Sequence, residues 1–220
     1  TYKDIIDIKH IKKLTGIKVS RKSVTIGATT KHAEVASSKA VQKAIPSLAK
    51  LAEGIGDAQV RNRGTVGGSI ANNDPSACYP SACMALNAII HTNGRKIEAS
   101  KFFKGMFETA LKKGELIEAV EFQIPEKSNY QKHPNPASRY AIVGVYLAKH
   151  KKEVNVAVTG AKSSVYIDKD LSKKLSSSFS SSAIEGMKLD SSEMNSDIHA
   201  SGEFRASLVA TYAKKAVEAC

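Results

Sequence analysis

Long apolar runs are absent from this sequence of 220 residues, although 42% of its residues are hydrophobic. No stretch approaches the roughly eighteen uninterrupted apolar residues that a membrane-spanning helix needs. The opening residues, TYKDIIDIKH, lack the pattern of a secretory signal peptide. A charged content of 25% is typical of globular rather than disordered chains. We therefore expect a cytoplasmic protein with no membrane span, folded as two modest domains or one irregular large one.

Cysteine is also scarce, with three residues, Cys78, Cys83 and Cys220. They form neither a secreted disulfide framework nor a paired C-x-x-C metal site. Three thiolates also fall short of the four that usually hold an iron–sulfur cluster. The six histidines are scattered, without the H-E-x-x-H spacing of a zinc site. We expect no metal site in this chain.

Acidic residues are fewer than basic ones, 21 against 33, which gives a formal net charge of +12. A clustered basic face would favour nucleic acid or another polyanion. Of the basic residues, however, 27 are Lys and six are Arg, and they are spread in ones and twos without interleaved aromatic residues. We interpret them as a solvated surface and expect no nucleic-acid partner.

Hydrophobic patterning predicts a mixture of helices and strands. The expected strands cover residues 24–28, 88–92, 95–99, 115–124, 140–148 and 153–159, and the expected helices cover 32–37, 40–44, 47–51, 81–86 and 203–219. Thr29 and Thr30 are the expected N-cap of the first helix, and Asn93-Gly94 is a strong hairpin signal. The serine-rich tract 172–182 predicts a loose helix or loop.

Residues 54–80 have a different texture, rich in Gly, Asn, Asp and Pro, which predicts loops around a ligand. Within them, the T-V-G-G-S segment places two adjacent glycines after a β-branched pair. Such glycines allow close backbone approach to a ligand and turn N–H groups inward as an anion-binding nest does. We expect a Cβ at either glycine to clash with ligand rather than with core. The segment fits a pyrophosphate-linked cofactor, although a Gly-Gly pair is also common in a plain tight turn, and neither the P-loop nor the G-x-G-x-x-G pattern is present.

Four strings in order along the chain carry a resemblance to a known family. They are VTIGATTKHAEV, GDAQVRNRGTVGGSIANNDPSACYP, NPASRYAIVGV and SDIHASGEFRASLV. Together they resemble the FAD-binding medium subunit of the molybdenum hydroxylases, the class of carbon monoxide dehydrogenase and xanthine dehydrogenase. The resemblance implies an α+β fold with a vanillyl-alcohol-oxidase-type FAD-binding domain over 1–125, a linker over 126–137, and a small domain of antiparallel sheet plus helices over 138–220.

The resemblance also implies where the FAD cofactor binds. The loop from Thr65 to Ser69 would lie against the pyrophosphate and ribityl chain, and Ile117 and Lys132 resemble family positions near the adenine end and near the flavin. The full set of expected cofactor-binding residues is Thr65, Val66, Gly67, Gly68, Ser69, Asn72, Asp74, Ile117 and Lys132. No catalytic side chain is expected, because the protein's part in flavin chemistry is binding, orientation and tuning.

Two departures from the family pattern are visible. Cys78 stands where many relatives have an aspartate, which removes one expected hydrogen bond to the cofactor, and its thiol is interpreted as a small buried hydrophobe. The second glycine-rich loop of the family, A-G-G-x-S, does not occur in residues 1–220. The FAD-binding domain is therefore expected to be N-terminally incomplete, and the segment alone is expected to hold little or no FAD.

The implied function is an electron relay. In the family, electrons pass from a molybdopterin-binding large subunit through an iron–sulfur small subunit to FAD, and then to an external acceptor. These two subunits are the expected partners. Two alternatives stay open: a flavin-dependent reductase of cell-wall sugar nucleotides with the same fold, and a non-catalytic remnant or interaction module that does not retain FAD.

Overall fold

The computed structural model describes residues 4–220, so the first three residues of the expected FAD-binding domain lie outside the described residues. A five-stranded antiparallel sheet has the order β1-β2-β7-β3-β4. Its strands are β1 (Ile17–Val19), β2 (Ser23–Gly27), β3 (Ile89–Thr92), β4 (Lys96–Glu98) and β7 (Ile117–Gln123), and a short 3-10 helix, Lys12–Leu14, precedes β1. The predicted hairpin at Asn93-Gly94 is confirmed, because β3 pairs with β4.

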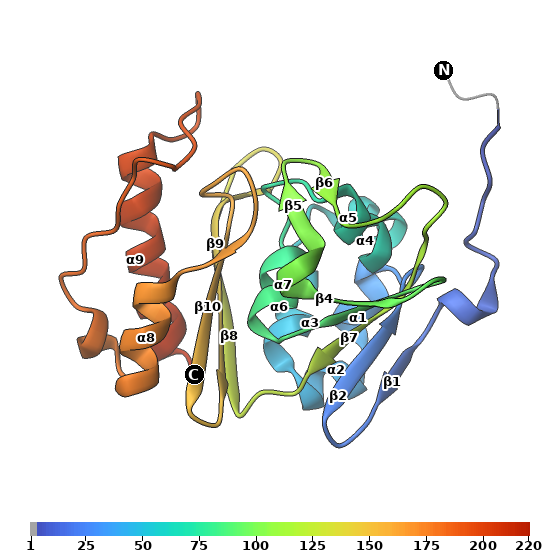
Figure 1. The fold of residues 1–220 in the computed structure, drawn as a ribbon, viewed down its shortest axis with the longest axis horizontal. Helices are drawn as coiled ribbons and strands as arrows, with labels where there is room; N and C mark the ends of the chain where they lie inside the picture. The colour runs from blue at the N-terminus through green and yellow to red at the C-terminus, as the bar shows by residue number, and fades with distance from the viewer. Residues whose placement is uncertain (1–3) are drawn as a thin grey trace.

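Short helices follow β2 and fill the space beside the first sheet. They are α1 (His32–Ser37), α2 (Lys39–Ala44), α3 (Pro46–Glu53), α4 (Ala58–Arg63), α5 (Val66–Asn72), α6 (Tyr79–Ala85) and α7 (Ala99–Phe102). The small hairpin of β5 (Phe103–Gly105) and β6 (Glu108–Thr109) follows α7. Pro46 occupies the first turn of α3, where its missing N–H costs nothing. Figure 1 shows α3 and α6 between this sheet and a second one.

The second sheet is antiparallel with the order β11-β10-β9-β8. Its strands are β8 (Lys127–Pro134), β9 (Ala141–His150), β10 (Glu153–Thr159) and the two-residue β11 (Tyr166–Ile167). The run AIVGVYLA in β9 is buried on both faces, because side chains alternate across a strand. Tyr146 packs into the core that α3 and α6 share, while Val145 and Leu147 face the opposite core.

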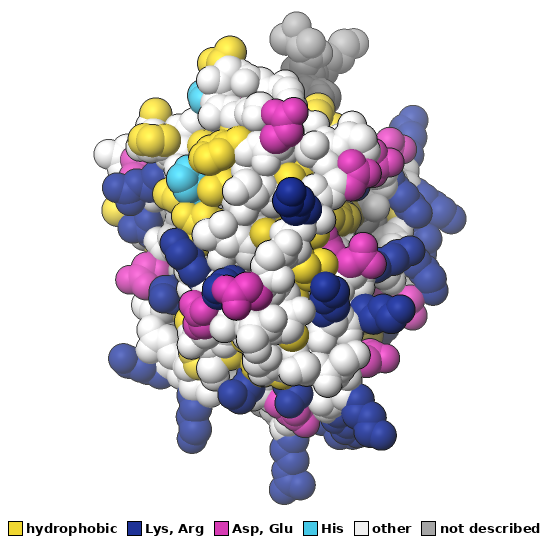
Figure 2. Space-filling model, turned by 90° about the vertical axis from the view of Figure 1, so that its left-hand side faces the viewer, with side chains coloured by type: hydrophobic (Ala, Val, Ile, Leu, Met, Phe, Trp, Pro, Cys, Tyr) yellow, Lys and Arg dark blue, Asp and Glu magenta, His cyan; other side chains and the backbone are white. Residues whose placement is uncertain are grey.

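The outer face of the second sheet is covered by α8 (Lys169–Ser177) and α9 (Gly202–Glu218), with a 3-10 turn, Ser181–Ile184, between them. The expected helix over 203–219 is confirmed as α9, which packs on the second sheet through Val209 and Ala213, both fully buried in that core. Figure 2 shows this side of the molecule, where Lys and Arg side chains are interspersed with Asp and Glu. The part of the chain that the structure describes contains no helix long and apolar enough to cross a membrane.

The expected α+β class is confirmed, and three local expectations are corrected. Residues 54–80 are largely helical, because α4, α5 and the start of α6 lie within them. Residues 126–137, expected as a linker, contain β8, which pairs with β9 along its length and buries Tyr130. Lys31 rather than Thr30 is the N-cap of α1, since Glu34 accepts a hydrogen bond from the Lys31 N–H in a capping box.

Candidate functional site

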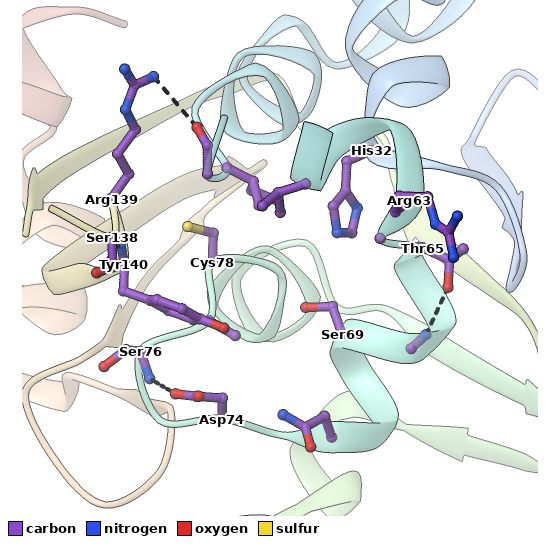
Figure 3. Close-up of a pocket in the computed structure, with 17 residues that line it drawn as sticks. His32, Arg63, Thr65, Ser69, Asp74, Ser76, Cys78, Ser138, Arg139 and Tyr140 are labelled. Carbon is purple, nitrogen blue, oxygen red and sulfur yellow. Dashed lines mark hydrogen bonds between the residues drawn. The ribbon is translucent and has the colours of Figure 1, made fainter. Parts of the chain in front are cut away.

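A cavity of about 430 Å³ opens where the helices α4 and α5 meet the start of the second sheet. Two stretches of chain far apart in sequence form its sides, and Figure 3 shows their side chains converging. We call residues 55–78 the helical wall and residues 138–140 the loop wall. The residues that line the cavity are His32, Ile55, Gly56, Val60, Arg63, Gly64, Thr65, Gly68, Ser69, Asn72, Asp74, Ser76, Ala77, Cys78, Ser138, Arg139 and Tyr140.

The T-V-G-G-S segment forms the start of α5 rather than an open turn. Thr65 is the N-cap, and its hydroxyl accepts a hydrogen bond from the Gly68 N–H at 3.2 Å. The N–H groups of Val66 and Gly67 donate to the carbonyls of Thr30 and Ala28. The expected nest of inward-pointing N–H groups is therefore corrected, because these donors already have partners within the chain.

The two adjacent glycines have different neighbours. A Cβ on Gly67 would lie 2.5 Å from the Ala28 Cβ and 2.9 Å from its Cα, so Gly67 permits α5 to pack closely on β2. A Cβ on Gly68 would meet only the Thr65 hydroxyl, at 3.0 Å, and Gly68 lines the cavity. The expectation that a Cβ at either glycine would meet ligand is thus wrong for Gly67, where the core is in the way.

His32 lies behind the helical wall and lines the cavity. Its side chain is buried, and burial lowers the pKa of the imidazole to about 4, so the ring is neutral at pH 7. The ring lies 5.3 Å from that of Tyr79, and a Cβ on Gly64 would come within 2.6 Å of its Nε2 atom. Within residues 4–220 the buried Nδ1 atom has no hydrogen-bond partner.

The loop wall enters the cavity from the second sheet. Arg139 has a φ of +61°, a left-handed conformation that non-glycine residues seldom adopt. The Lys132 ammonium holds this turn by donating to the carbonyls of Arg139 at 2.9 Å and Gly54 at 2.7 Å. Lys132 thereby joins the loop wall to the end of α3, with the Cys78 sulfur 3.6 Å from its Nζ.

Most of the expected cofactor-binding residues meet at this cavity. Thr65, Gly68, Ser69, Asn72 and Asp74 line it. The remaining four do not: Val66 and Gly67 are buried against the core, Ile117 is buried in β7, and Lys132 lies beside the loop wall.

Sequence reasoning missed His32 and the entire loop wall. The string NPASRYAIVGV marked the segment, yet nothing local indicates that Ser138, Arg139 and Tyr140 face Ser69. Arg63 was quoted as part of the motif without being assigned to the site.

Comparison with known proteins then supplies the family. Residues 1–126, more than half of the chain, match the family described as the FAD binding domain in molybdopterin dehydrogenase. The chain belongs to this family. The resemblance to medium subunits of molybdenum hydroxylases and the assignment of FAD as cofactor are both confirmed.

Relatives of this FAD-binding chain are subunits of dehydrogenases. The glyceraldehyde dehydrogenase medium chain of Sulfolobus acidocaldarius is 38% identical over 150 residues, which cover 66% of this chain and 53% of that protein. The carbon monoxide dehydrogenase medium chain of Hydrogenophaga pseudoflava is 29% identical, over 98% of this chain and 80% of that protein. The chain thus spans about half of the first relative and four fifths of the second.

Solved structures share the fold of this FAD-binding chain. The cyanide-inactivated Cu,Mo-CO dehydrogenase matches with a TM-score of 0.86 at 24% identity, over 96% of this chain and 80% of that one. Quinoline 2-oxidoreductase from Pseudomonas putida 86 matches with a TM-score of 0.85 at 25% identity, over 97% and 80%. The expected fold class, an FAD-binding domain followed by antiparallel sheet with helices, is confirmed.

The donors of the cavity fit a dinucleotide cofactor. Among the described residues, the side chains of Arg63, Ser69 and Asn72 have no protein hydrogen-bond partner, although all three line the cavity. The guanidinium suits a phosphate group, and the hydroxyl and amide suit phosphate or sugar oxygens. The buried, unpartnered Nδ1 of His32 is a further polar group beside the same space.

Proposed function

We propose that this chain is the FAD-carrying subunit of a molybdenum hydroxylase and passes electrons from a partner's iron–sulfur clusters to an external acceptor. The observation that carries the proposal is the cavity, which places the unpartnered donors of the helical wall opposite the loop wall. The family match supports FAD as the occupant. When bound, FAD supplies the reversible uptake of electrons.

The cofactor contacts are assigned to the five expected residues at the cavity. Ser69 and Asn72 would donate to the FAD from α5, and Thr65 and Gly68 would form the surface against it. Asp74 keeps one carboxylate oxygen for the cofactor, because its Oδ1 accepts the Ser76 N–H at 2.8 Å. The other four expected residues do not line the cavity. Val66 and Gly67 anchor α5, and Lys132 fixes the loop wall. The contact of Ile117 with the adenine end stays a prediction.

The chain's own groups bind and orient the cofactor rather than transfer protons. His32 is neutral at pH 7, so it adds no positive charge to the cavity, and its ring excludes water from the space behind Gly64. Cys78 is buried at the cavity wall, in keeping with a small apolar role for its thiol.

We also propose that residues up to 125 and from 138 onward are two domains, with β8 attached to the second.

The proposed partners are a molybdopterin-binding large subunit and an iron–sulfur small subunit. Support comes from the relatives, which include medium chains and a protein named as subunit alpha of the 6-hydroxypseudooxynicotine dehydrogenase complex from Paenarthrobacter nicotinovorans, 28% identical over 96% of this chain and 77% of that protein. Co-expression of the three subunits followed by size-exclusion chromatography should yield one complex. A chain that elutes alone in the presence of both partners would contradict this assignment.

FAD titration of the purified protein tests the cofactor assignment directly. We expect flavin fluorescence to be quenched on binding, and Ser69→Ala to weaken binding by about tenfold, since a charge-assisted hydrogen bond contributes roughly 1.5–3 kcal/mol. Ser176→Ala, far away on α8, is the matched control. The 220-residue segment should be titrated both alone and joined to a relative's segment that carries A-G-G-x-S. Absence of binding in both forms would favour the interaction-module alternative.

A further inference from the structure

A buried arginine lies outside the cavity and beneath both of its walls. Arg205 in α9 is 3% exposed, and arginine is rarely buried to this degree without partners. Its Nη1 donates to the carbonyls of Ile142 at 2.6 Å and Gly160 at 2.9 Å. Ile142 lies near the start of β9, and Gly160 directly follows β10. The guanidinium therefore ties together the ends of two neighbouring strands.

The same strand ends hold the helical wall in place. The Gly160 N–H donates to the Pro75 carbonyl at 2.8 Å, and the Thr159 hydroxyl lies 2.8 and 2.7 Å from the carbonyl oxygens of Pro75 and Ala77, between which it shares its one proton. The Ala141 N–H donates to the Ser76 carbonyl at 3.2 Å. Ser76 and Ala77 line the cavity, so this side of the helical wall is fastened to the strand ends that Arg205 joins.

The strand ends pack too closely to shift freely. Gly160 has a φ of +83°, and a Cβ there would lie 2.5 Å from the Ala141 carbonyl oxygen and 2.6 Å from that of Ile142. Tyr140 directly precedes Ala141 and forms part of the loop wall. Movement of these strand ends would therefore move both walls of the cavity.

A third contact of Arg205 reaches the loop wall by another route. Its Nη2 donates to the Asp197 carboxylate at 2.7 Å, and the other oxygen of Asp197 accepts the N–H groups of His199 and Ala200. The His199 ring contacts the Asn135 amide at 3.3 Å. Asn135 Oδ1 accepts the N–H groups of residues 137 and 138, which leaves Nδ2 as the donor to His199.

We infer that Arg205 is a positioning residue for the FAD cavity, which holds the helical wall and the loop wall in register without touching the cofactor. The inference rests on the proposed FAD binding at this cavity. A planar guanidinium reaches two carbonyls and a carboxylate at once, whereas a lysine ammonium at the end of a flexible stem does not reproduce that fork. The position therefore requires arginine rather than a positive charge alone.

Arg205→Lys in the full-length protein tests the inference against Val209→Ala. Val209 is fully buried one turn further along α9, so its truncation destabilises the helix packing while the hydrogen bonds of Arg205 to the strand ends are kept. We measure the melting temperature, the FAD dissociation constant, and amide hydrogen exchange at Ala141 and Gly160 in FAD-free protein. Arg205→Lys should weaken FAD binding by about tenfold or more and speed exchange at both amides, while Val209→Ala should change FAD binding by less than about twofold.

The inference is overturned if the two variants have equal FAD affinity and equal exchange at these amides. If the unsubstituted protein binds FAD neither alone nor joined to a segment that carries A-G-G-x-S, the proposed function fails. The exchange comparison at Ala141 and Gly160 then still tests whether Arg205 holds the strand ends. Should Arg205→Lys fail to fold, Asp197→Asn replaces it, because Asn keeps an oxygen for the N–H groups of His199 and Ala200 but loses the charge that faces Arg205. Asp197→Asn should also weaken FAD binding and speed amide exchange at Ala141 and Gly160, by less than Arg205→Lys. The inference is overturned if Asp197→Asn changes neither the FAD affinity nor the exchange.

Discussion

The two walls of the cavity differ in how they are built. The helical wall is a continuous segment whose far side is buried in the first core, through Val66 and Ile70. The loop wall is three exposed residues that follow β8, and the Lys132 side chain of β8 holds it in place by donating to the Arg139 carbonyl. The helical wall is thus part of the first hydrophobic core. The loop wall lines the cavity but contributes little to the stability of the fold. Substitutions should separate these two properties.

The largest effect is expected on the core side of the helical wall. Gly67→Val places side-chain atoms where Ala28 already lies within 2.5 Å of a Cβ, so α5 must move away from β2. We expect a loss of about 3 kcal/mol in the free energy of unfolding, at the upper end for overpacked cores. Urea denaturation measures it. Unchanged stability would mean that the helical wall is not part of the hydrophobic core.

His32 should make stability depend on pH. Its folded pKa of about 4 lies below the unfolded value of 6.5, so the unfolded chain binds more protons between these values. The stability that the neutral ring provides is fully present above pH 6.5 and is lost as the pH falls toward 4, by at most about 1.4 kcal/mol per pH unit. Urea denaturation between pH 4 and 7 should show this slope for the native chain and a shallower one for His32→Gln.

The cavity side of the helical wall should respond differently from its core side. Gly68→Ala adds a methyl group that meets only the Thr65 hydroxyl, and alanine favours the helix by roughly 1 kcal/mol over glycine. We therefore expect stability within about 1 kcal/mol of the native chain, but FAD affinity reduced by about tenfold. A large stability loss with intact FAD binding would assign Gly68 to the core together with Gly67.

The smallest stability effect is expected in the loop wall. Tyr140 is 50% exposed and lines the cavity, so Tyr140→Ala should alter the free energy of unfolding by no more than about 0.5 kcal/mol. FAD affinity should nevertheless fall, because the ring closes one side of the cavity. Tyr212→Ala, in α9 and away from the cavity, is the matched control for loss of an aromatic ring. Equal affinity in the two variants would remove the loop wall from the site.

Patterning predicted six strands, β2, β3, β4, β7, β9 and β10, because period-two alternation and β-branched runs are local signals, whereas β1, β5, β6, β8 and β11 were not predicted. The hairpin at Asn93-Gly94 was likewise predicted from its turn residues. The failures have a common cause. Residues 54–80 contain many turn formers, yet tertiary packing and caps at Asp57 and Thr65 make short helices of them. The polar segment 126–137 gave no strand signal, because β8 obtains its stability from pairing with β9.

The sequence by itself determined the family and the cofactor, through four strings that occur in order along the chain. It also determined five residues of the cavity, because these five lie in one short contiguous segment. Tertiary structure decided which glycine faces ligand and which faces core, since adjacent residues of a helix point in different directions. It also brought Tyr140 opposite Ser69 and placed Arg205 under both walls. Such contacts join residues more than forty positions apart, and they exist only once the tertiary structure has formed.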